Sequence, residues 1–152
     1  MPTASATIDI PASADQVWQL IGGFNTLPDW LPLITHSELS EGGRVRTLQT
    51  ADGGVVVERL QTFDNAARTY SYSIEQAPFP ASDYLATIKV EAQGQGARVT
   101  WSGRFNAVGV SDEEVVALFN GIYQGGLEAL RANYPTRDAL RPISKAGTRS
   151  VP

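Results

Sequence analysis

Residues 54–91 read GVVVERLQTFDNAARTYSYSIEQAPFPASDYLATIKVE, and this stretch decides the fold. Apolar and polar side chains alternate along it in three runs, with the period of two that is typical of half-buried strands. The runs lie at 54–63, 68–76 and 82–92. The turn-forming residues Asp64-Asn65 and Pro78-Phe79-Pro80 separate them. Because these connections are short, the pattern predicts consecutive antiparallel strands in a meander.

The alternation continues on both sides of this stretch. It predicts four more strands, at 3–10, 35–41, 43–50 and 96–106. Turns that contain glycine separate the later runs, and such turns are typical of hairpins. The chain is therefore expected to contain seven strands, six of them consecutive.

Two short helices are expected between the first and second strands. Ser13 and Gln16 have the spacing of a capping box, which marks the start of the first helix. Its core-facing stripe consists of Val17, Leu20, Ile21 and Phe24. The second short helix is expected at 25–34, where apolar residues recur at helical spacing.

A long helix is expected at 111–134, near the end of the chain. Ser111 and Glu114 form a second capping-box pattern, and Pro135 limits the helix at its other end. The pair Gly125-Gly126 costs helix stability, about 1 kcal/mol per glycine relative to alanine. We therefore expect either a close approach of another element at this pair or a bend over a cavity.

This order of elements predicts an α+β fold in which a curved antiparallel sheet wraps around the long helix. One helix is narrower than a seven-stranded sheet, so the sheet has to curl in order to bury its apolar face. Curling leaves a space between the helix and the sheet. We expect the function of the protein to lie in that space.

Composition narrows the classes of function. The chain has 152 residues, 42% of them hydrophobic and 18% charged, which suits one globular domain. We expect that domain at 1–134, followed by a flexible tail at 135–152. The formal net charge of -4 disfavours nucleic acid as a partner. No run resembles a signal peptide or a membrane span, so we expect a cytoplasmic protein without membrane insertion.

Metal sites and disulfides are not expected. Cysteine is absent and His36 is the only histidine, which argues against zinc and against thiol chemistry. We expect no cofactor, and a small hydrophobic molecule as the partner. The sequence leaves the oligomeric state open, with a homodimer among the assemblies it allows.

The strands also carry a series of motifs in a fixed order. They are Gly43-x-Val45-Arg46-Thr47-Leu48, Asp52-Gly53, Glu58-Arg59-Leu60, Asp64, Tyr70-Ser71-Tyr72-Ser73-Ile74, Tyr84-x-Ala86-Thr87-Ile88 and Trp101-Ser102-Gly103-x-Phe105. This series resembles the START-like (SRPBCC, Bet v 1-like) superfamily, and within it the polyketide cyclase/dehydratase-type branch. The resemblance covers residues 3–134. It implies the helix-grip fold, in which a seven-stranded antiparallel sheet grips a long C-terminal helix.

One member of that superfamily, the plant lachrymatory factor synthase, is similar in the same motifs. It moves a proton within a small sulfenic acid, using an arginine, a glutamate and a tyrosine. These correspond to Arg46, Glu58 and Tyr84 here, so the resemblance implies a catalytic role for each. The sulfenic acid itself is not implied, because the residues expected to line the pocket differ.

Strand alternation is compatible with a cavity that these three residues share. Glu58 alternates with apolar residues and so lies on an otherwise apolar face, and Tyr84 begins the apolar face of its own strand. The orientation of Arg46 stays open, because Val45 and Thr47 could equally face inward. Burial raises the pKa of a carboxyl group and a nearby guanidinium lowers it, so Glu58 could act as a base near neutral pH.

The alternative is a structural role for each of these residues. Arg46 and Glu58 could form a salt bridge across neighbouring strands, and Tyr84 could be a core tyrosine. A further set of large side chains is expected to line the cavity and to bind the ligand. This set comprises Trp30, Leu31, Tyr70, Tyr72, Trp101, Phe105, Phe119 and Tyr123.

Two hypotheses about function follow. In the first, the protein is an enzyme that performs isomerisation, cyclisation or dehydration by acid–base chemistry on a small hydrophobic molecule. In the second, it is a non-catalytic carrier or sensor that uses the same cavity. The aromatic residues together favour a flat or aromatic ligand over a long acyl chain.

Overall fold

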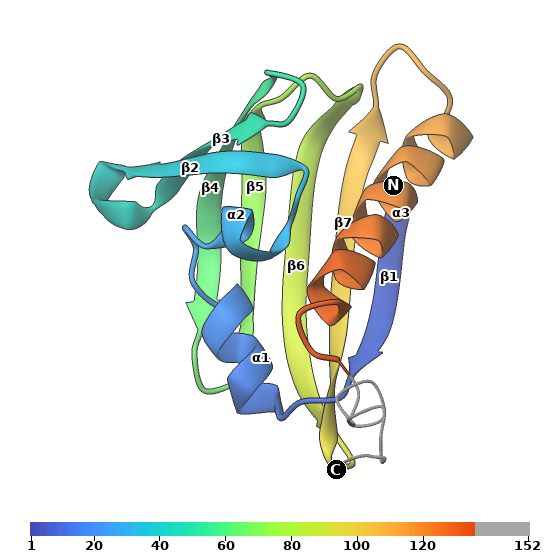
Figure 1. Ribbon diagram of the computed structural model, residues 1–152. Coiled ribbons are helices and arrows are strands. Elements are labelled where there is room, and N and C mark those ends of the chain that lie inside the picture. Colours follow the sequence, from blue (N-terminus) through green and yellow to red (C-terminus); the bar gives the residue numbers. More distant parts are fainter. Residues whose placement is uncertain (136–152) are drawn as a thin grey trace.

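Seven antiparallel strands form one sheet, which curves around helix α3 (Figure 1). The computed structural model describes residues 1–135. The elements are β1 (Thr3–Ile10), α1 (Ala14–Ile21), α2 (Leu27–Trp30), β2 (Ile34–Ser40), the 3-10 turn η1 (Glu41–Gly43), β3 (Val45–Thr50), β4 (Val55–Asp64), β5 (Thr69–Gln76), β6 (Ala81–Gln93), β7 (Gly96–Ala107) and α3 (Asp112–Arg131). The sheet order is β1-β7-β6-β5-β4-β3-β2. The predicted helix-grip fold is confirmed.

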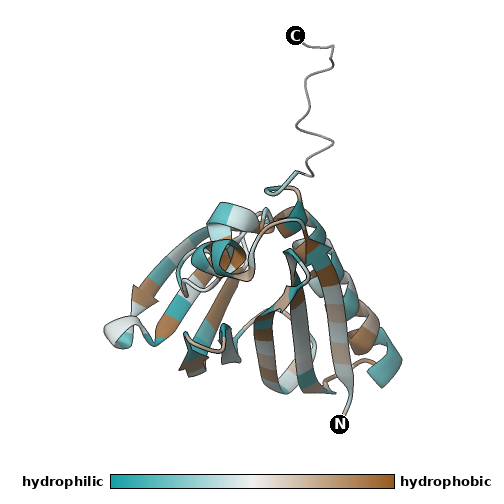
Figure 2. Ribbon diagram, turned by 90° about the horizontal axis from the view of Figure 1, so that it is seen from below, coloured by the Kyte–Doolittle hydropathy of each residue, from teal (hydrophilic) through white to brown (hydrophobic). Residues whose placement is uncertain are grey.

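The two strands that are far apart in sequence, β1 and β7, pair along the whole length of β1. Helix α3 contacts both of them, while α1 and α2 lie over the other half of the concave face (Figure 1). Hydrophobic and hydrophilic bands alternate along the strands (Figure 2), as a sheet with one buried face requires. The core therefore lies between the concave face and the three helices.

Breaks in the strand register help the sheet to curl. The pairing of β4 with β5 shifts beside Glu58 and again beyond Leu60, and the pairing of β6 with β7 shifts between Ser82 and Leu85. Such bulges bend a strand and increase its twist. Two of these shifts lie next to Glu58 and Tyr84, so the curvature of the sheet and the aim of both side chains have a common origin.

The predicted second helix is wrong in its length. A helix at 25–34 was expected, but α2 ends at Trp30, and Ile34 already begins β2. Leu31 has φ -116° and ψ 99°, an extended conformation. The residue before a proline is driven out of the helical region by the proline ring, and Pro32 has this effect on Leu31.

Both capping boxes form as predicted, with Ser13 and Ser111 as N-cap residues. No helix within residues 1–135 is long and apolar enough to cross a membrane. The predicted flexible tail, 135–152, lies outside the described residues apart from Pro135.

The glycine pair in α3 makes the close approach that was one of the two expectations. A methyl group on Gly126 would lie 2.8 Å from the Trp101 ring and 2.9 Å from Leu31 Cδ1, whereas one on Gly125 would meet nothing within 4 Å. At Gly126, helix α3 thus reaches β7 and the residue that follows α2, and Gly125 faces outward.

These neighbouring glycines provide a matched pair for mutation. We expect Gly125→Ala to stabilise the protein by about 0.5–1 kcal/mol, because alanine favours the helix. We expect Gly126→Ala to destabilise it by about 1–3 kcal/mol, because the methyl group overpacks the core. Chemical denaturation monitored by circular dichroism gives both values, and equal effects of the two substitutions would contradict the packing described above.

Candidate active site

A small hollow lies between α3, the α2 segment and the concave face of the sheet, and has a volume of about 40 Å³. Most of its wall is apolar, and Glu58 is the single charged side chain among the described residues that line it. The lining residues are Leu27, Leu31, Leu33, Ile34, Leu48, Thr50, Val56, Glu58, Tyr72, Ile74, Phe79, Tyr84, Trp101, Phe119, Ile122 and Tyr123.

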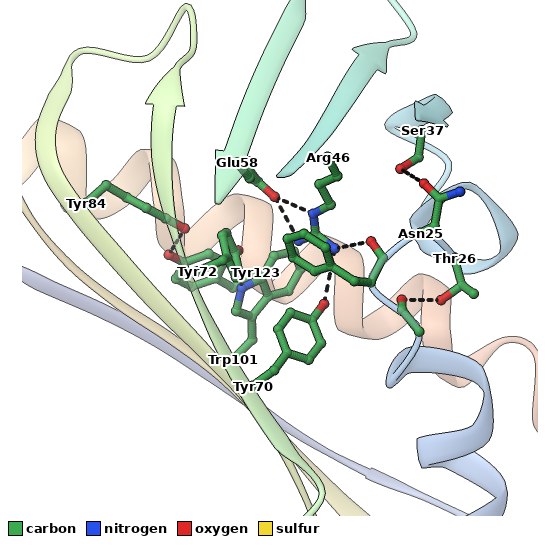
Figure 3. A network of polar contacts seen from close by, with 12 residues as sticks. Asn25, Thr26, Ser37, Arg46, Glu58, Tyr70, Tyr72, Tyr84, Trp101 and Tyr123 are labelled. Atoms are coloured by element: carbon green, nitrogen blue, oxygen red, sulfur yellow. Dashed lines mark hydrogen bonds and ion pairs between the residues drawn. The ribbon is translucent and has the colours of Figure 1, made fainter. Parts of the chain in front are cut away.

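Glu58 reaches this wall from β4 and is paired with Arg46 on β3. The two residues are directly opposite in the strand register. Arg46 Nε lies 2.8 Å and Nη2 2.7 Å from the same carboxylate oxygen, Glu58 Oε1 (Figure 3). No described residue donates a hydrogen bond to the other oxygen, Oε2. Glu58 therefore has one oxygen engaged and one that can accept a hydrogen bond from a ligand.

Arg46 lies behind Glu58 and does not line the hollow. Its side chain is 1% exposed, and its Nη1 donates to the Phe24 carbonyl oxygen at 2.9 Å and to Tyr70 Oη at 3.4 Å. The guanidinium carbon also lies 4.2 Å from the centre of the Phe24 ring and 4.9 Å from that of Tyr72. Hydrogen bonds and ring faces thus hold the cation in place, and it acts on the hollow through Glu58.

The protonation of this pair follows from its burial. Desolvation raises the pKa of the Glu58 carboxyl above its ordinary value of 4.5, and the charge and hydrogen bonds of Arg46 only partly oppose this rise. Burial lowers the pKa of Arg46, but Tyr70, Glu58 and Tyr72 outweigh it, and the net direction is upward. Arg46 therefore remains protonated, while Glu58 is a stronger base than an exposed carboxylate.

Tyr84 and Tyr123 form a second polar pair on the same wall. Tyr84 extends from β6, Tyr123 extends from α3, and their hydroxyl groups are hydrogen-bonded to each other (Figure 3). Burial raises the pKa of Tyr84 well above its ordinary value, and also raises that of Tyr123. Both phenols are therefore protonated at neutral pH. The pair has two hydroxyl protons. One of them forms the hydrogen bond between the two tyrosines, so the other remains available for donation.

Two other residues complete the polar contacts near the hollow. Trp101 Nε1 donates to Tyr72 Oη at 3.0 Å, so the indole N–H is satisfied and the phenol acts as the acceptor. Trp101 also stacks on Tyr123, with ring centroids 4.7 Å apart. These contacts fix the orientation of the wall.

The structure brings most of the predicted site residues together. Glu58 and Tyr84 line the hollow, and Arg46 supports Glu58 from behind. Of the residues predicted to bind the ligand, five line the hollow: Leu31, Tyr72, Trp101, Phe119 and Tyr123.

Three residues predicted to line the cavity are buried elsewhere. Trp30 packs edge-on against Trp101, and its Nε1 has no hydrogen-bond partner among the described residues. Tyr70 lies beside Arg46, and Phe105 is covered by Tyr84. All three are on the concave side, but the hollow occupies only part of that face.

Sequence reasoning missed Phe79 and the partnership of Tyr84 with Tyr123. Phe79 is in the connection between β5 and β6, which we treated as a turn, yet its ring packs against Phe119 on the wall. A large aromatic residue between two prolines was the signal that could have revealed it. For the tyrosine pair, the signal was Gly103, a glycine at an inward position of the predicted strand 96–106, where a larger residue would be expected.

Comparison with known proteins agrees with the geometry. Residues 1–134 match the family described as polyketide cyclase / dehydrase and lipid transport. The chain belongs to this family. The assignment to the START-like (SRPBCC, Bet v 1-like) superfamily and to its polyketide cyclase branch is thereby confirmed. No curated protein sequence matches the chain.

Solved structures of bacterial proteins are similar to this polyketide cyclase family member over most of its length. XoxI from Bacillus cereus is 51% identical, with a TM-score of 0.86, and the match covers 88% of this chain and 96% of that one. A protein from Bacillus thuringiensis is 50% identical, with a TM-score of 0.86, covering 87% and 98%. A START superfamily protein from Mycobacterium smegmatis is 16% identical, with a TM-score of 0.73, covering 88% and 97%, and shares the fold alone.

The raised pKa of Glu58 can be measured by carbon-detected NMR of its carboxyl group. We expect it to titrate above 4.5, and to titrate at still higher pH in Arg46→Met, because that change removes the guanidinium that lowers the pKa. Arg44→Met removes an exposed arginine of the same segment and should leave the titration unchanged. A lower Glu58 pKa in Arg46→Met would refute this account of the pair.

The same shift predicts a dependence of stability on pH. Since the folded-state pKa of Glu58 lies above its unfolded value, folding favours the protonated carboxyl, and this contribution is fully present below pH 4.5. It is lost as the pH rises from 4.5 through the folded-state pKa. The free energy of unfolding of the wild type relative to Glu58→Gln should therefore fall across this window in denaturation series. A difference that is constant with pH would contradict the prediction.

Proposed function

We propose that the protein binds a small, largely apolar carbonyl compound in the hollow and moves a proton on it by acid–base chemistry. The observation that carries this proposal is the free Oε2 of Glu58, a carboxylate oxygen of a largely buried residue on a mostly apolar wall that also includes Tyr84 and Tyr123. Membership in a family described as polyketide cyclase / dehydrase and lipid transport supports a hydrophobic ligand. Isomerisation, cyclisation and dehydration all begin with such a proton transfer.

In the proposed reaction Glu58 is the base. Its carboxylate takes a proton from the carbon beside the ligand carbonyl, and the electron pair of that C–H bond forms the enolate. The free proton of the Tyr84–Tyr123 pair is donated in a hydrogen bond to the developing oxyanion. Glu58 then returns its proton to carbon. Arg46 positions Glu58, and its charge lowers the pKa of Glu58 against the effect of burial.

Binding requires the wall to move. A volume of about 40 Å³ is well below the roughly 150 Å³ of an engineered cavity that holds benzene. Phe79 is one of the wall residues placed to move, because it is half-buried and belongs to a connection rather than to the sheet or to α3. It also lines a groove of about 370 Å³ on the outside, together with Ile74 and Tyr84. These three residues line both the hollow and the groove, so we propose that the ligand passes Phe79.

A carrier or sensor is the second candidate, and one observation favours it. The guanidinium of Arg46 already engages Glu58 Oε1 and does not reach the hollow, which is the arrangement expected for a structural ion pair. The family description also names lipid transport. In that case the hollow binds its ligand unchanged. Native mass spectrometry of protein purified from its own host would reveal a retained small molecule.

Hydrogen–deuterium exchange separates the two candidates. We expect the wild type to accelerate exchange of the carbon-bound protons beside the carbonyl of phenylacetone in D₂O, followed by proton NMR. Glu58→Gln should reduce this acceleration by at least about 10²-fold, the worth of a general base, with near-unchanged affinity for phenylacetone. The rate should increase with pH through the Glu58 pKa. Full exchange in Glu58→Gln would eliminate Glu58 as the base, and binding without exchange in the wild type would favour the carrier.

A further inference from the structure

Gly103 occupies a position in β7 where a glycine is costly. It lies inside a central strand, paired with Ala86 on β6 and with Ala4 on β1. Glycine weakens a strand interior, because it has high conformational freedom in the unfolded chain and no side chain to pack. Gly103 belongs to the inward face of β7, beneath α3. Its presence there calls for a reason in the packing.

The reason is the hydroxyl group of Tyr123. A Cβ atom placed on Gly103 would overlap Tyr123 Oη and lie 3.3 Å from Cζ of the same ring. Tyr123 is fully buried and stacked on Trp101, so its ring cannot simply swing aside. Because Gly103 has no side chain, the Tyr123 hydroxyl group has room at this position to form its hydrogen bond with Tyr84.

The other member of the pair is aimed by an irregularity in β6. Between the pairs Ser82–Asn106 and Leu85–Arg104, β6 has two residues, Asp83 and Tyr84, where β7 has only Phe105. Asp83 adopts φ 52°, a left-handed conformation that non-glycine residues seldom take, and its carboxylate accepts a hydrogen bond from Asn106 Nδ2 at 3.0 Å. Tyr84 follows directly, and stacks on Phe105 with an interplanar angle of 14°.

We propose that Gly103 is a positioning residue, which holds Tyr123 against Tyr84 so that one phenolic proton of the pair is directed at an acceptor on the ligand. Two separate features each cost stability, namely a glycine inside β7 and an aspartate with left-handed backbone conformation in β6. Both are next to residues of this one hydroxyl contact. The inference rests on the proposed function, because it assigns the acceptor to the carbonyl oxygen. It makes Tyr123 part of the site and gives Gly103 a role through Tyr123.

The test uses Gly103→Ala, Tyr123→Phe, their double variant and the matched control Gly125→Ala, whose methyl group would meet no atom within 4 Å. Affinity is measured for phenylacetone and for methallylbenzene, in which a CH₂ group replaces the carbonyl oxygen. We expect the wild type and Gly125→Ala to prefer the ketone, and this preference to fall roughly fivefold, the worth of one hydrogen bond, in the other three variants.

Thermal melting separates positioning from packing. Gly103→Ala should lower the melting temperature, and Tyr123→Phe in the same chain should restore much of it, because phenylalanine has no hydroxyl to collide with the methyl group. The ketone preference should remain lost in the double variant. Recovery of both the melting temperature and the preference would overturn the proposal, since Gly103 would then serve packing alone. Should Gly103→Ala fail to fold, the double variant still tests the role of Gly103, because it should fold nearly as well as Tyr123→Phe if the hydroxyl group is the reason for the glycine, and a double variant that also fails to fold would overturn the proposal.

A ligand-free measurement keeps this inference separate from the proposed function. In tyrosine-labelled wild type and in Gly125→Ala, the hydroxyl proton shared by the pair should exchange slowly with water and give its own NMR signal. The signal should disappear in Gly103→Ala and in Tyr123→Phe. Its persistence in Gly103→Ala would refute the positioning role, whereas failure of the wild type to bind either probe would refute the proposed function and leave the hydroxyl signal to decide the role of Gly103.

Discussion

The enclosure of a charged pair, Arg46 with Glu58, is the constraint on which the site depends. Removing two charges from water costs several kcal/mol per ion, and their mutual attraction offsets this only where geometry and additional hydrogen bonds are favourable. Here the guanidinium binds one carboxylate oxygen twice and is also held by the Phe24 carbonyl oxygen and by aromatic rings. β3, β4, β5 and the segment after α1 must all meet at this point. The concave face is thereby held in the curvature that leaves a hollow beside it.

Most of the wall of that hollow is apolar, and two polar pairs beside it, the ion pair and the tyrosine pair, leave groups that a ligand can use. The carboxylate oxygen left over from the ion pair offers an acceptor, and the tyrosine pair offers one donor. A ligand that satisfies both must carry complementary groups, which gives a mostly hydrophobic hollow some chemical selectivity. Aromatic contacts of Trp101 with Tyr123 and of Phe119 with Phe105 pack around the tyrosine pair.

The alternation of side chains was enough to predict the strands and the inward aim of Glu58 and Tyr84, and the capping-box pattern with Pro135 was enough to predict the helix that the sheet grips. It could not orient Arg46, because Val45 beside it is buried as well, at 3% exposed. The length of α2 depended on one residue before a proline, a local effect that overrides apolar spacing. Helical spacing alone was therefore a poor guide in this segment.

Contacts between elements were beyond the reach of sequence patterns. The bond between Tyr84 and Tyr123 joins residues 39 positions apart and depends on how α3 is seated over β7. Likewise, Tyr70 and Phe105 are buried like Tyr72 and Trp101, but only the latter two border the hollow. Periodicity identifies a buried face, while the location of a cavity along that face is set by tertiary packing.

The setting of Phe79 between Pro78 and Pro80 has a consequence for kinetics. Each proline fixes its own φ angle and restricts the residue before it, so this connection has few backbone conformations to exchange between. Movement of Phe79 is then mainly rotation about its side-chain bonds, and such rotation is faster than a collective rearrangement of the backbone. The residence time of a ligand in the hollow would accordingly be governed by the strength of its contacts with the wall, rather than by a slow rearrangement of the chain.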